Sequence, residues 1–220
     1  MRKSRLFAAV LLVCLSLASC APVIVGRTPQ PAAPEEWEFS LNLGYPLLSP
    51  YENDPFNGPV QAPTAQPLNL FLARGVGGNT ELNGTLSLSL GPSLRLGGKT
   101  LLVGEPVPVA VDYGASWFPL GNDGYLSDFV FDAGLLFSYS QPGVEPYGAL
   151  RGFVSTSPRS ATDSLHLTGA VTIGADIPAG SGNFFVEVTA HTTMFEGAEY
   201  YNAPLPPIGF SIVPALGYRF

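Results

Sequence analysis

The stretch FSIVPALGYRF, residues 210–220, decides the fold because its two faces differ in polarity. Every second residue counted back from the end is apolar or aromatic, and this face comprises Phe220, Tyr218, Leu216, Pro214, Ile212 and Phe210. The residues between them are small or polar, apart from Val213. A period of two with one apolar face is the pattern of a β-strand.

The same alternation recurs along the chain in segments of about ten residues. It predicts strands over 37–45, 68–75, 81–90, 93–102, 107–117, 128–139, 146–155, 165–177, 184–194 and 210–220. The count is ten, or eight if 81–90 and 93–102 form one bent strand and the weak segment 68–75 is a loop. The short link Gly91–Pro92 stands where a long connection is expected, which favours eight. After residue 20 no apolar run reaches the length of a transmembrane helix.

A last strand that ends on Phe220 resembles the closing strand of bacterial outer-membrane β-barrels. The alternating strands and the 25 glycines and 22 prolines that separate them are similar to the same family. The resemblance covers residues 36–220 and implies an all-β fold, a closed antiparallel up-and-down transmembrane β-barrel of about ten strands. It also implies an outer-membrane location, contact with outer-membrane lipids and lipopolysaccharide, and Tyr218 and Phe220 as a signal read by the barrel-assembly machinery. The segment RGVGGNTE, residues 74–81, resembles the tight turns of these barrels.

Residues 1–20 form a signal peptide, with a basic head, an apolar core and the lipobox-like run Leu17-Ala18-Ser19-Cys20. This run predicts cleavage before Cys20 and lipidation of that cysteine. The alternative is an ordinary secretory signal cut near Ala21. Residues 21–35 are rich in proline and alanine, and we expect an extended, poorly ordered tether.

The charge of the chain excludes one class of partner. The formal net charge is −7, and removing the three basic residues of the leader lowers it to −10. So acidic a chain is a poor nucleic-acid binder. Several acids fall in predicted loops, where they give a solvated surface or, alternatively, bind divalent cations bridging lipopolysaccharide: Glu52, Asp54, Asp123, Asp163, Glu196 and Glu199.

The polar face of the strands carries charges that the alternation directs into the lumen. This predicted lumen network comprises Glu38, Glu81, Arg95, Lys99, Asp112, Asp132, Arg151, Asp176, Glu187, His191 and Arg219, with Asp128 and His166 on the same face. Buried charges are costly unless they are paired or hydrated. The acids and bases therefore either pair and close the lumen, or the excess of acid lines a small path for cations. A barrel of ten strands is narrow, which favours the closed lumen.

The apolar face should meet lipid, with aromatic residues at both rims. One predicted rim comprises Trp37, Tyr139, Tyr147, Phe184, Tyr218 and Phe220, and the other Tyr45, Trp117, Tyr125, Phe195 and Phe210. We expect Val109, Val171 and Val188 in mid-strand on the lipid face, and Thr85 and Thr172 in the lumen.

Catalysis has little support in the sequence. The two histidines, His166 and His191, lie in no nucleophile motif and are too few for a dedicated zinc site. No helix is predicted after Gly75–Gly78 to make a phosphate loop. We therefore expect no enzyme and no cofactor, but a small or plugged pore, an envelope-stabilising protein or a surface-interaction protein. The alternatives are a soluble, lipid-anchored barrel that binds an apolar ligand, and a barrel enzyme acting on lipid A or peptides.

Overall fold

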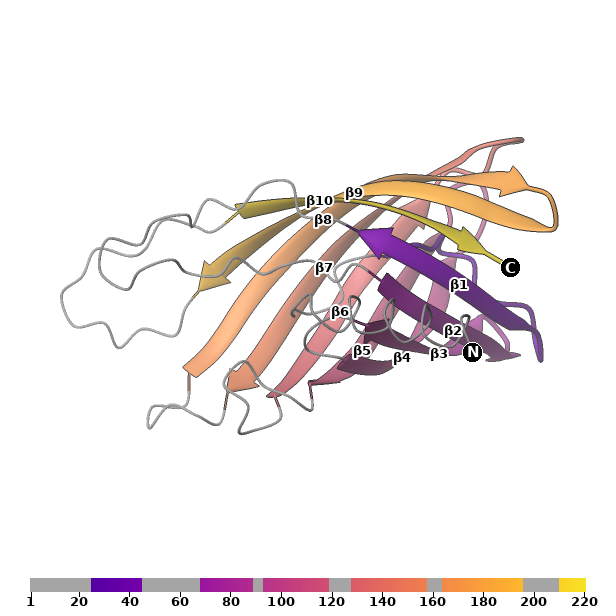
Figure 1. The fold of residues 1–220 in the computed structure, drawn as a ribbon. Coiled ribbons are helices and arrows are strands. Elements are labelled where there is room, and N and C mark those ends of the chain that lie inside the picture. The colour runs from indigo at the N-terminus through magenta and orange to yellow at the C-terminus, as the bar shows by residue number, and fades with distance from the viewer. Residues whose placement is uncertain (1–24, 45–67, 89–92, 119–127, 158–163, 196–209) are drawn as a thin grey trace, which may run out of the picture.

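Ten antiparallel strands close into a single barrel in the computed structural model, which describes residues 25–44, 68–88, 93–118, 128–157, 164–195 and 210–220 (Figure 1). The strands are β1 (Trp37–Gly44), β2 (Leu68–Gly77), β3 (Thr80–Leu88), β4 (Ser93–Val103), β5 (Val109–Phe118), β6 (Asp128–Ser138), β7 (Glu145–Ser157), β8 (Ser164–Ala179), β9 (Gly182–Phe195) and β10 (Phe210–Arg219). Each strand pairs with its sequence neighbours, and β1 also pairs with β10. The predicted up-and-down barrel is confirmed. No helix long and apolar enough to cross a membrane occurs in the part of the chain that the structure describes.

The alternative of eight strands is wrong. β3 and β4 are separate strands that pair antiparallel, with Ser87 opposite Ser93. β2 is also a full strand, and its register with β3 runs from Leu68 opposite Leu88 to Gly77 opposite Thr80. The short link between β3 and β4 therefore joins two strands and does not bend one.

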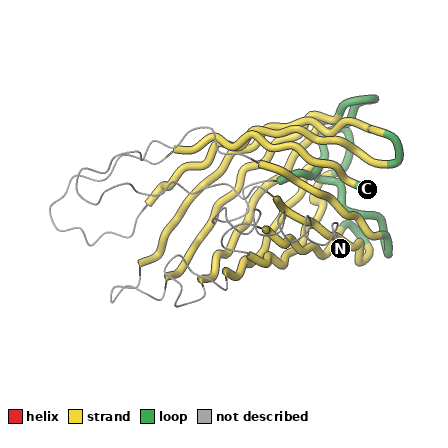
Figure 2. Tube along the Cα trace, in the orientation of Figure 1, coloured by secondary structure: helices red, strands yellow, loops and turns green. Residues whose placement is uncertain are grey.

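The four connections between strands that the structure describes all lie at one end of the barrel, which we call the short-turn end (Figure 2). They are residues 78–79, 104–108, 139–144 and 180–181. The turn between β2 and β3 needs positive φ angles, 109° at Gly77 and 58° at Gly78, which glycine adopts without a steric penalty. The tight turn expected from residues 74–81 is therefore present. β1 starts and β10 ends at this same end (Figure 1).

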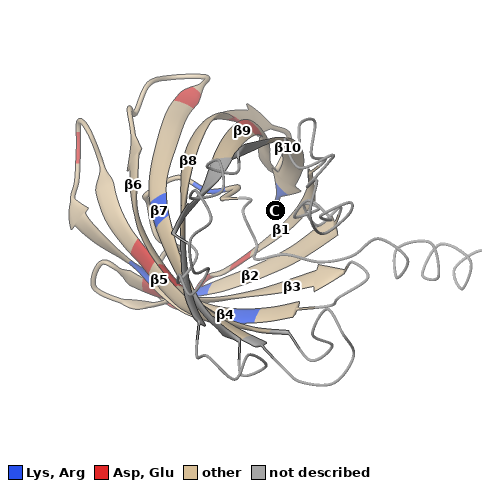
Figure 3. Cartoon of the chain, turned by 90° about the vertical axis from the view of Figure 1, so that its left-hand side faces the viewer, with Lys and Arg blue, Asp and Glu red and all other residues tan. Residues whose placement is uncertain are grey.

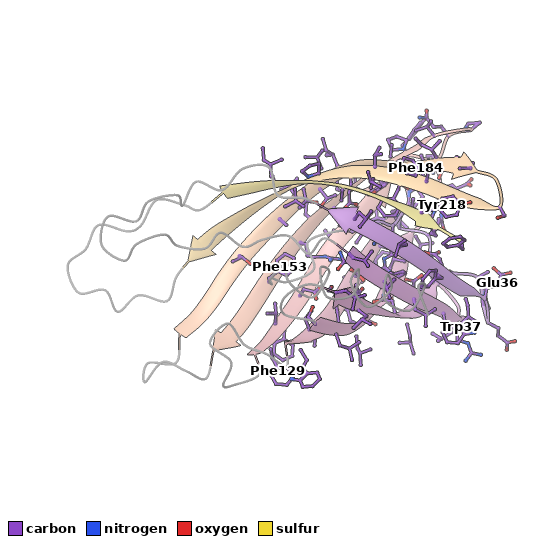
Figure 4. All side chains as sticks on the ribbon, in the orientation of Figure 1. Glu36, Trp37, Phe129, Phe153, Phe184 and Tyr218 are labelled. Atoms are coloured by element: carbon purple, nitrogen blue, oxygen red, sulfur yellow. The ribbon has the colours of Figure 1, made fainter. Side chains whose placement is uncertain are left out.

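The polarity of the barrel is opposite to that of a soluble protein. Its outer face is apolar and exposed: Trp37 is 61% exposed and Ile173 67%. Figure 4 shows Trp37 and Phe129 at opposite ends of the barrel. The inner face is polar, and both Glu81 and Lys99 are fully buried. The strand alternation read from the sequence thus sorts the side chains as expected.

One predicted position differs. Val109 is the first residue of β5 and lies at the short-turn end, opposite Val103 and Phe137. The sequence placed it in mid-strand because the alternation extends back to Val107, but residues 104–108 form the turn. Val171 and Val188 do lie within their strands on the outer face, whereas Thr85 and Thr172 are buried on the inner face.

Candidate functional site

The lumen contains a cluster of paired charges on the wall formed by β3 to β7 (Figure 3). The guanidinium of Arg95 donates to both carboxylate oxygens of Asp132, at 2.7 and 2.8 Å, and to Asn83 Oδ1 at 2.9 Å. Arg95 also donates to Asp112 Oδ2 at 3.2 Å, and Arg151 binds the same carboxylate. Two arginines of the wall thus converge on one buried aspartate.

A second cluster lies near the short-turn end on the opposite side of the barrel. Arg219 near the end of β10 binds Asp176 of β8, and its Nη1 lies 3.9 Å from Glu38 Oε1. Asn183 also donates to Asp176, at 2.6 Å. The side chain of Arg219 is partly exposed, so water reaches this cluster from the mouth of the barrel.

The N-terminal segment, residues 25–34, fills the lumen next to the short-turn end, and we call it the N-terminal plug. Residues 25–29 are buried, whereas residues 30–34 are half-buried or exposed, and Pro34 forms an isolated bridge with Gly75 at the rim. The structure thus differs from the extended, poorly ordered tether expected over 21–35; residues 21–24 lie outside the described residues. The physical reason is long-range: the plug supplies donors to acids on the barrel wall that lack enough partners of their own.

Arg27 is the centre of these contacts. Its guanidinium binds Glu81 and donates to Asp112 Oδ1 at 2.8 Å, and its Cζ lies 4.4 Å from the centroid of the Phe71 ring. In the opposite direction, the ammonium of Lys99 on the wall donates to the plug carbonyls of Thr28 at 3.0 Å and Gln30 at 2.7 Å. The plug therefore both donates to wall acids and accepts from a wall base.

Glu187 of β9 holds the other end of the plug. Its two carboxylate oxygens accept the backbone N–H groups of Val25 and Gly26, each at 2.8 Å. The hydroxyl of Tyr147 donates to the same carboxylate at 2.7 Å. Val25 packs in a small apolar cluster with Leu136, Tyr147 and Ala149. A buried carboxylate without an arginine or lysine partner is thereby satisfied by three hydrogen bonds.

The placement of Tyr147 corrects the prediction of a lipid-facing rim residue. Tyr147 is buried in the lumen and shares the inner face of β7 with Ala149 and Arg151. The sequence of β7 was ambiguous because glycines and alanines leave both faces weakly apolar. The inward position of Arg151 fixes the parity of the whole strand, since side chains alternate strictly.

The structure brings ten members of the predicted lumen network to the inner face, and the side chain of His191 lies outside the described residues. The ten are Glu38, Glu81, Arg95, Lys99, Asp112, Asp132, Arg151, Asp176, Glu187 and Arg219. The side chains of Asp128 and His166, and all six predicted loop acids, also lie outside the described part. Sequence reasoning missed Arg27 and Tyr147. The signal for Arg27 was arithmetic: seven predicted inward acids, Asp128 included, face only four lysines and arginines, and Arg27 is the one base of residues 21–36.

The predicted assembly signal lies at the seam that closes the barrel. Phe220 donates its backbone N–H to Phe39 O at 2.8 Å, and the two rings lie 5.8 Å apart. The ring of Tyr218 contacts that of Phe220 edge-on at 4.7 Å. Cys20, the predicted lipidation site, lies outside the described residues.

Several buried polar atoms of the inner wall have no hydrogen-bond partner among the described residues: Ser40 Oγ, Asn42 Oδ1, Asn83 Nδ2 and Ser116 Oγ. Buried polar groups normally bind protein or water, so these atoms make a lumen that suits water. No group of three or more histidines, cysteines or acids in the described part could hold a metal ion.

No protein-family model and no curated protein sequence matches the chain. Among solved structures, the crystal structure of the N-terminal β-barrel domain of Pseudomonas aeruginosa OprF is similar at 11% sequence identity and a TM-score of 0.32. The match covers 83% of this chain and 97% of that chain. A likeness of this size carries no argument about function, and no residue role is transferred from it.

Proposed function

We propose that this protein is an integral outer-membrane β-barrel whose lumen is closed by its own N-terminal plug, and that it serves the envelope as a structural or surface-interaction barrel. The observation that carries the proposal is the inverted polarity of the barrel, apolar outside and charged inside. Soluble monomers rarely expose contiguous apolar patches of more than a few hundred Å². Here large apolar side chains are exposed on strands all around the barrel.

The dimensions of the strands support a membrane-spanning barrel. β5 has 10 residues, which at a rise of about 3.3 Å each give a length of roughly 33 Å. A tilt of about 40° reduces this to a height of roughly 25 Å, the height of the apolar band of outer-membrane barrels. Closure of β1 on β10 pairs the backbone all the way round, which a bilayer demands.

The alternative of a soluble barrel that binds an apolar ligand has no support in the lumen. That alternative needs an apolar interior, whereas this interior carries Asp112, Arg95 and Arg151 in one ion-pair cluster. The enzyme alternative needs a nucleophile or a free acid–base pair facing open space. The described acids of the lumen are instead engaged by arginine, lysine, backbone or hydroxyl donors.

Lipidation at Cys20 and recognition of Tyr218 and Phe220 by the assembly machinery complete the proposal. The lipid rests on the lipobox-like run alone. Mass spectrometry of the N-terminal peptide of the protein purified from membranes is expected to show an acylated cysteine. An unmodified peptide that begins at Ala21 would refute lipidation and leave the barrel unaffected.

Neighbouring residues on opposite faces provide the test of the membrane barrel. Nitroxide labels are placed at Val171 and Val188 on the outer face, and at Thr172 and Thr189 on the inner face, where the two hydroxyls lie 2.7 Å apart. In lipid vesicles the outer labels should be reached by oxygen and shielded from a water-soluble nickel complex. The inner labels should be shielded from oxygen, and the parent chain without added cysteine gives the background.

Outer labels shielded from both reagents would mean that protein covers this face, which contradicts a membrane barrel. Outer labels reached freely by nickel would mean that the face lies in water. Either result refutes the proposed function.

A further inference from the structure

The described ion pairs between residues of the barrel wall do not reach across the lumen. Each ion pair between wall residues that the structure describes joins strands that are adjacent or two places apart, so these contacts run along the wall and do not cross the barrel. The pairs are Glu81–Lys99, Arg95–Asp112, Arg95–Asp132, Arg151–Asp112, Arg151–Asp132, Arg219–Asp176 and Arg219–Glu38. The hydrogen bond from Tyr147 to Glu187 likewise joins β7 to β9. These wall-to-wall contacts narrow the lumen but do not span it.

The N-terminal plug is the element that crosses. It is bound to Gly75 of β2 and Glu81 of β3 at one end and to Glu187 of β9 at the other. In the circular order of the barrel, β3 and β9 are four places apart, close to the maximum of five in a ring of ten. The plug therefore bridges nearly opposite walls, which the wall ion pairs do not.

The plug is also built to leave without unfolding the barrel. It contains Pro29, Pro31 and Pro34, which have no N–H group and cannot extend a strand ladder. Its single bridge to the sheet is between Pro34 and Gly75. The other contacts that hold it are ion pairs, hydrogen bonds to wall side chains and the packing of Val25 and Arg27 against the wall, so its departure breaks no pairing between strands.

The charge left behind favours cations. Without Arg27 the described inner wall carries seven acids, Glu38, Glu81, Asp112, Asp132, Glu145, Asp176 and Glu187, against four bases, Arg95, Lys99, Arg151 and Arg219. Glu187 would lose the two N–H donors of the plug and keep only the hydroxyl of Tyr147. An acidic, polar lumen attracts small cations and repels anions.

We propose that residues 25–34 are a displaceable plug and that the lumen they close conducts small cations when they leave it. This inference rests on the proposed membrane barrel and adds an activity to it. A ten-stranded barrel is far narrower than the 16-stranded porins, so the path admits ions and not larger solutes.

Two substitutions weaken the plug by different physical means. Arg27→Gln removes the ion pairs to Glu81 and Asp112. Gly26→Val leaves every charge in place, but a Cβ at Gly26 would lie 2.7 Å from Phe185 Cζ, and its φ of 57° is unfavourable for a β-branched residue. The matched controls lie on the outer face: Arg74→Gln, and Gly152→Val, where the nearest atom to a new Cβ is 4.0 Å away.

The measurement is single-channel current in planar bilayers, with each protein produced from the full chain and purified from membranes. The parent protein and both controls should be closed for almost all of the recording. Arg27→Gln and Gly26→Val should each raise the open probability at least about tenfold. Arg27→Gln removes one partner of buried ion pairs, which strongly destabilises the docked state, and Gly26→Val destabilises it through the clash of the new side chain with Phe185. In a KCl gradient the sign of the reversal potential should show that potassium carries most of the current.

Heat-modifiable gel mobility and insertion into vesicles are measured on the same samples. Inserted, folded variants that stay as silent as the parent would overturn the inference and leave the proposed function intact. So would a parent that conducts as often as the variants, or a current carried by chloride. A parent chain that does not insert would refute the proposed function itself. Should Arg27→Gln fail to fold, Gly26→Val alone decides, since it keeps all lumen charges.

Discussion

At the scale of single residues, a glycine on the inner wall allows a large side chain from the neighbouring strand to lie over it. Tyr147 lies over Gly174, its register partner on β8, and so reaches Glu187 on the next strand. A Cβ at Gly174 would lie 2.5 Å from Tyr147 Cζ and 2.7 Å from its hydroxyl. The hydrogen bond that helps to satisfy a buried carboxylate thus requires glycine at this position.

Gly174→Ala should therefore lower the free energy of unfolding of the barrel in lipid vesicles by about 1–3 kcal/mol, measured by urea titration. The substitution pushes the ring away and leaves Glu187 with fewer donors. Gly152→Ala on the outer face of β7 is the control and should cost much less, because the nearest atom to a Cβ there is 4.0 Å away. Equal losses for the two variants would mean that the close approach of Tyr147 contributes nothing.

At the scale of elements, β10 and β1 form a short seam, with a register from Ser40 opposite Arg219 to Gly44 opposite Ala215. Phe220 extends this seam by one hydrogen bond and one ring contact to Phe39. The residue predicted as an assembly signal therefore also has a structural contact. The two roles are separable because only one of them needs Phe39.

Deleting Phe220 should lower the folded, heat-modifiable fraction in cells at unchanged synthesis, whereas Phe39→Ala, which removes the same ring contact, should lower it much less. Both variants should fold to a similar extent when purified chains are refolded into vesicles without assembly factors. If the two variants lose folded protein equally in cells, Phe220 acts through the seam and the signal hypothesis is wrong.

The elements also show what a sequence can and cannot predict. Ten strands were predictable because alternation is local: the outward Leu82 and the inward Glu81 differ in polarity whatever the rest of the chain does. The plug was not predictable in this way, because Val25 and Glu187 are 162 residues apart and the plug has no period. Its prolines instead suggested a solvated tether. The plug is buried because its charges complement those of the lumen wall. In the sequence, the only sign of this complementarity was Arg27, a base that could offset the excess of inward acids.

At the scale of the whole molecule, the two tryptophans mark opposite rims of the apolar band. Trp37 is the first residue of β1 at the short-turn end, with the guanidinium of Arg74 at 5.3 Å from its ring centroid. Trp117 lies next to the last residue of β5, at the other end, and is also exposed on the outer face. Tryptophan favours the membrane–water interface, so these two rings predict how deep the proposed membrane barrel lies in the bilayer.

Vesicles made with lipids brominated at different depths test that seating. The single-tryptophan proteins Trp37→Phe and Trp117→Phe report on one rim each. Bromines near the headgroups should quench both proteins most strongly, and bromines near the chain ends should quench both weakly, since each indole lies at a rim and neither at the bilayer centre. Strong quenching of either protein by deep bromines would mean that the barrel sits at a different depth from the one its apolar band requires. Absence of quenching in both would mean that these rings do not face lipid at all, because their exposure leaves no protein to shield them.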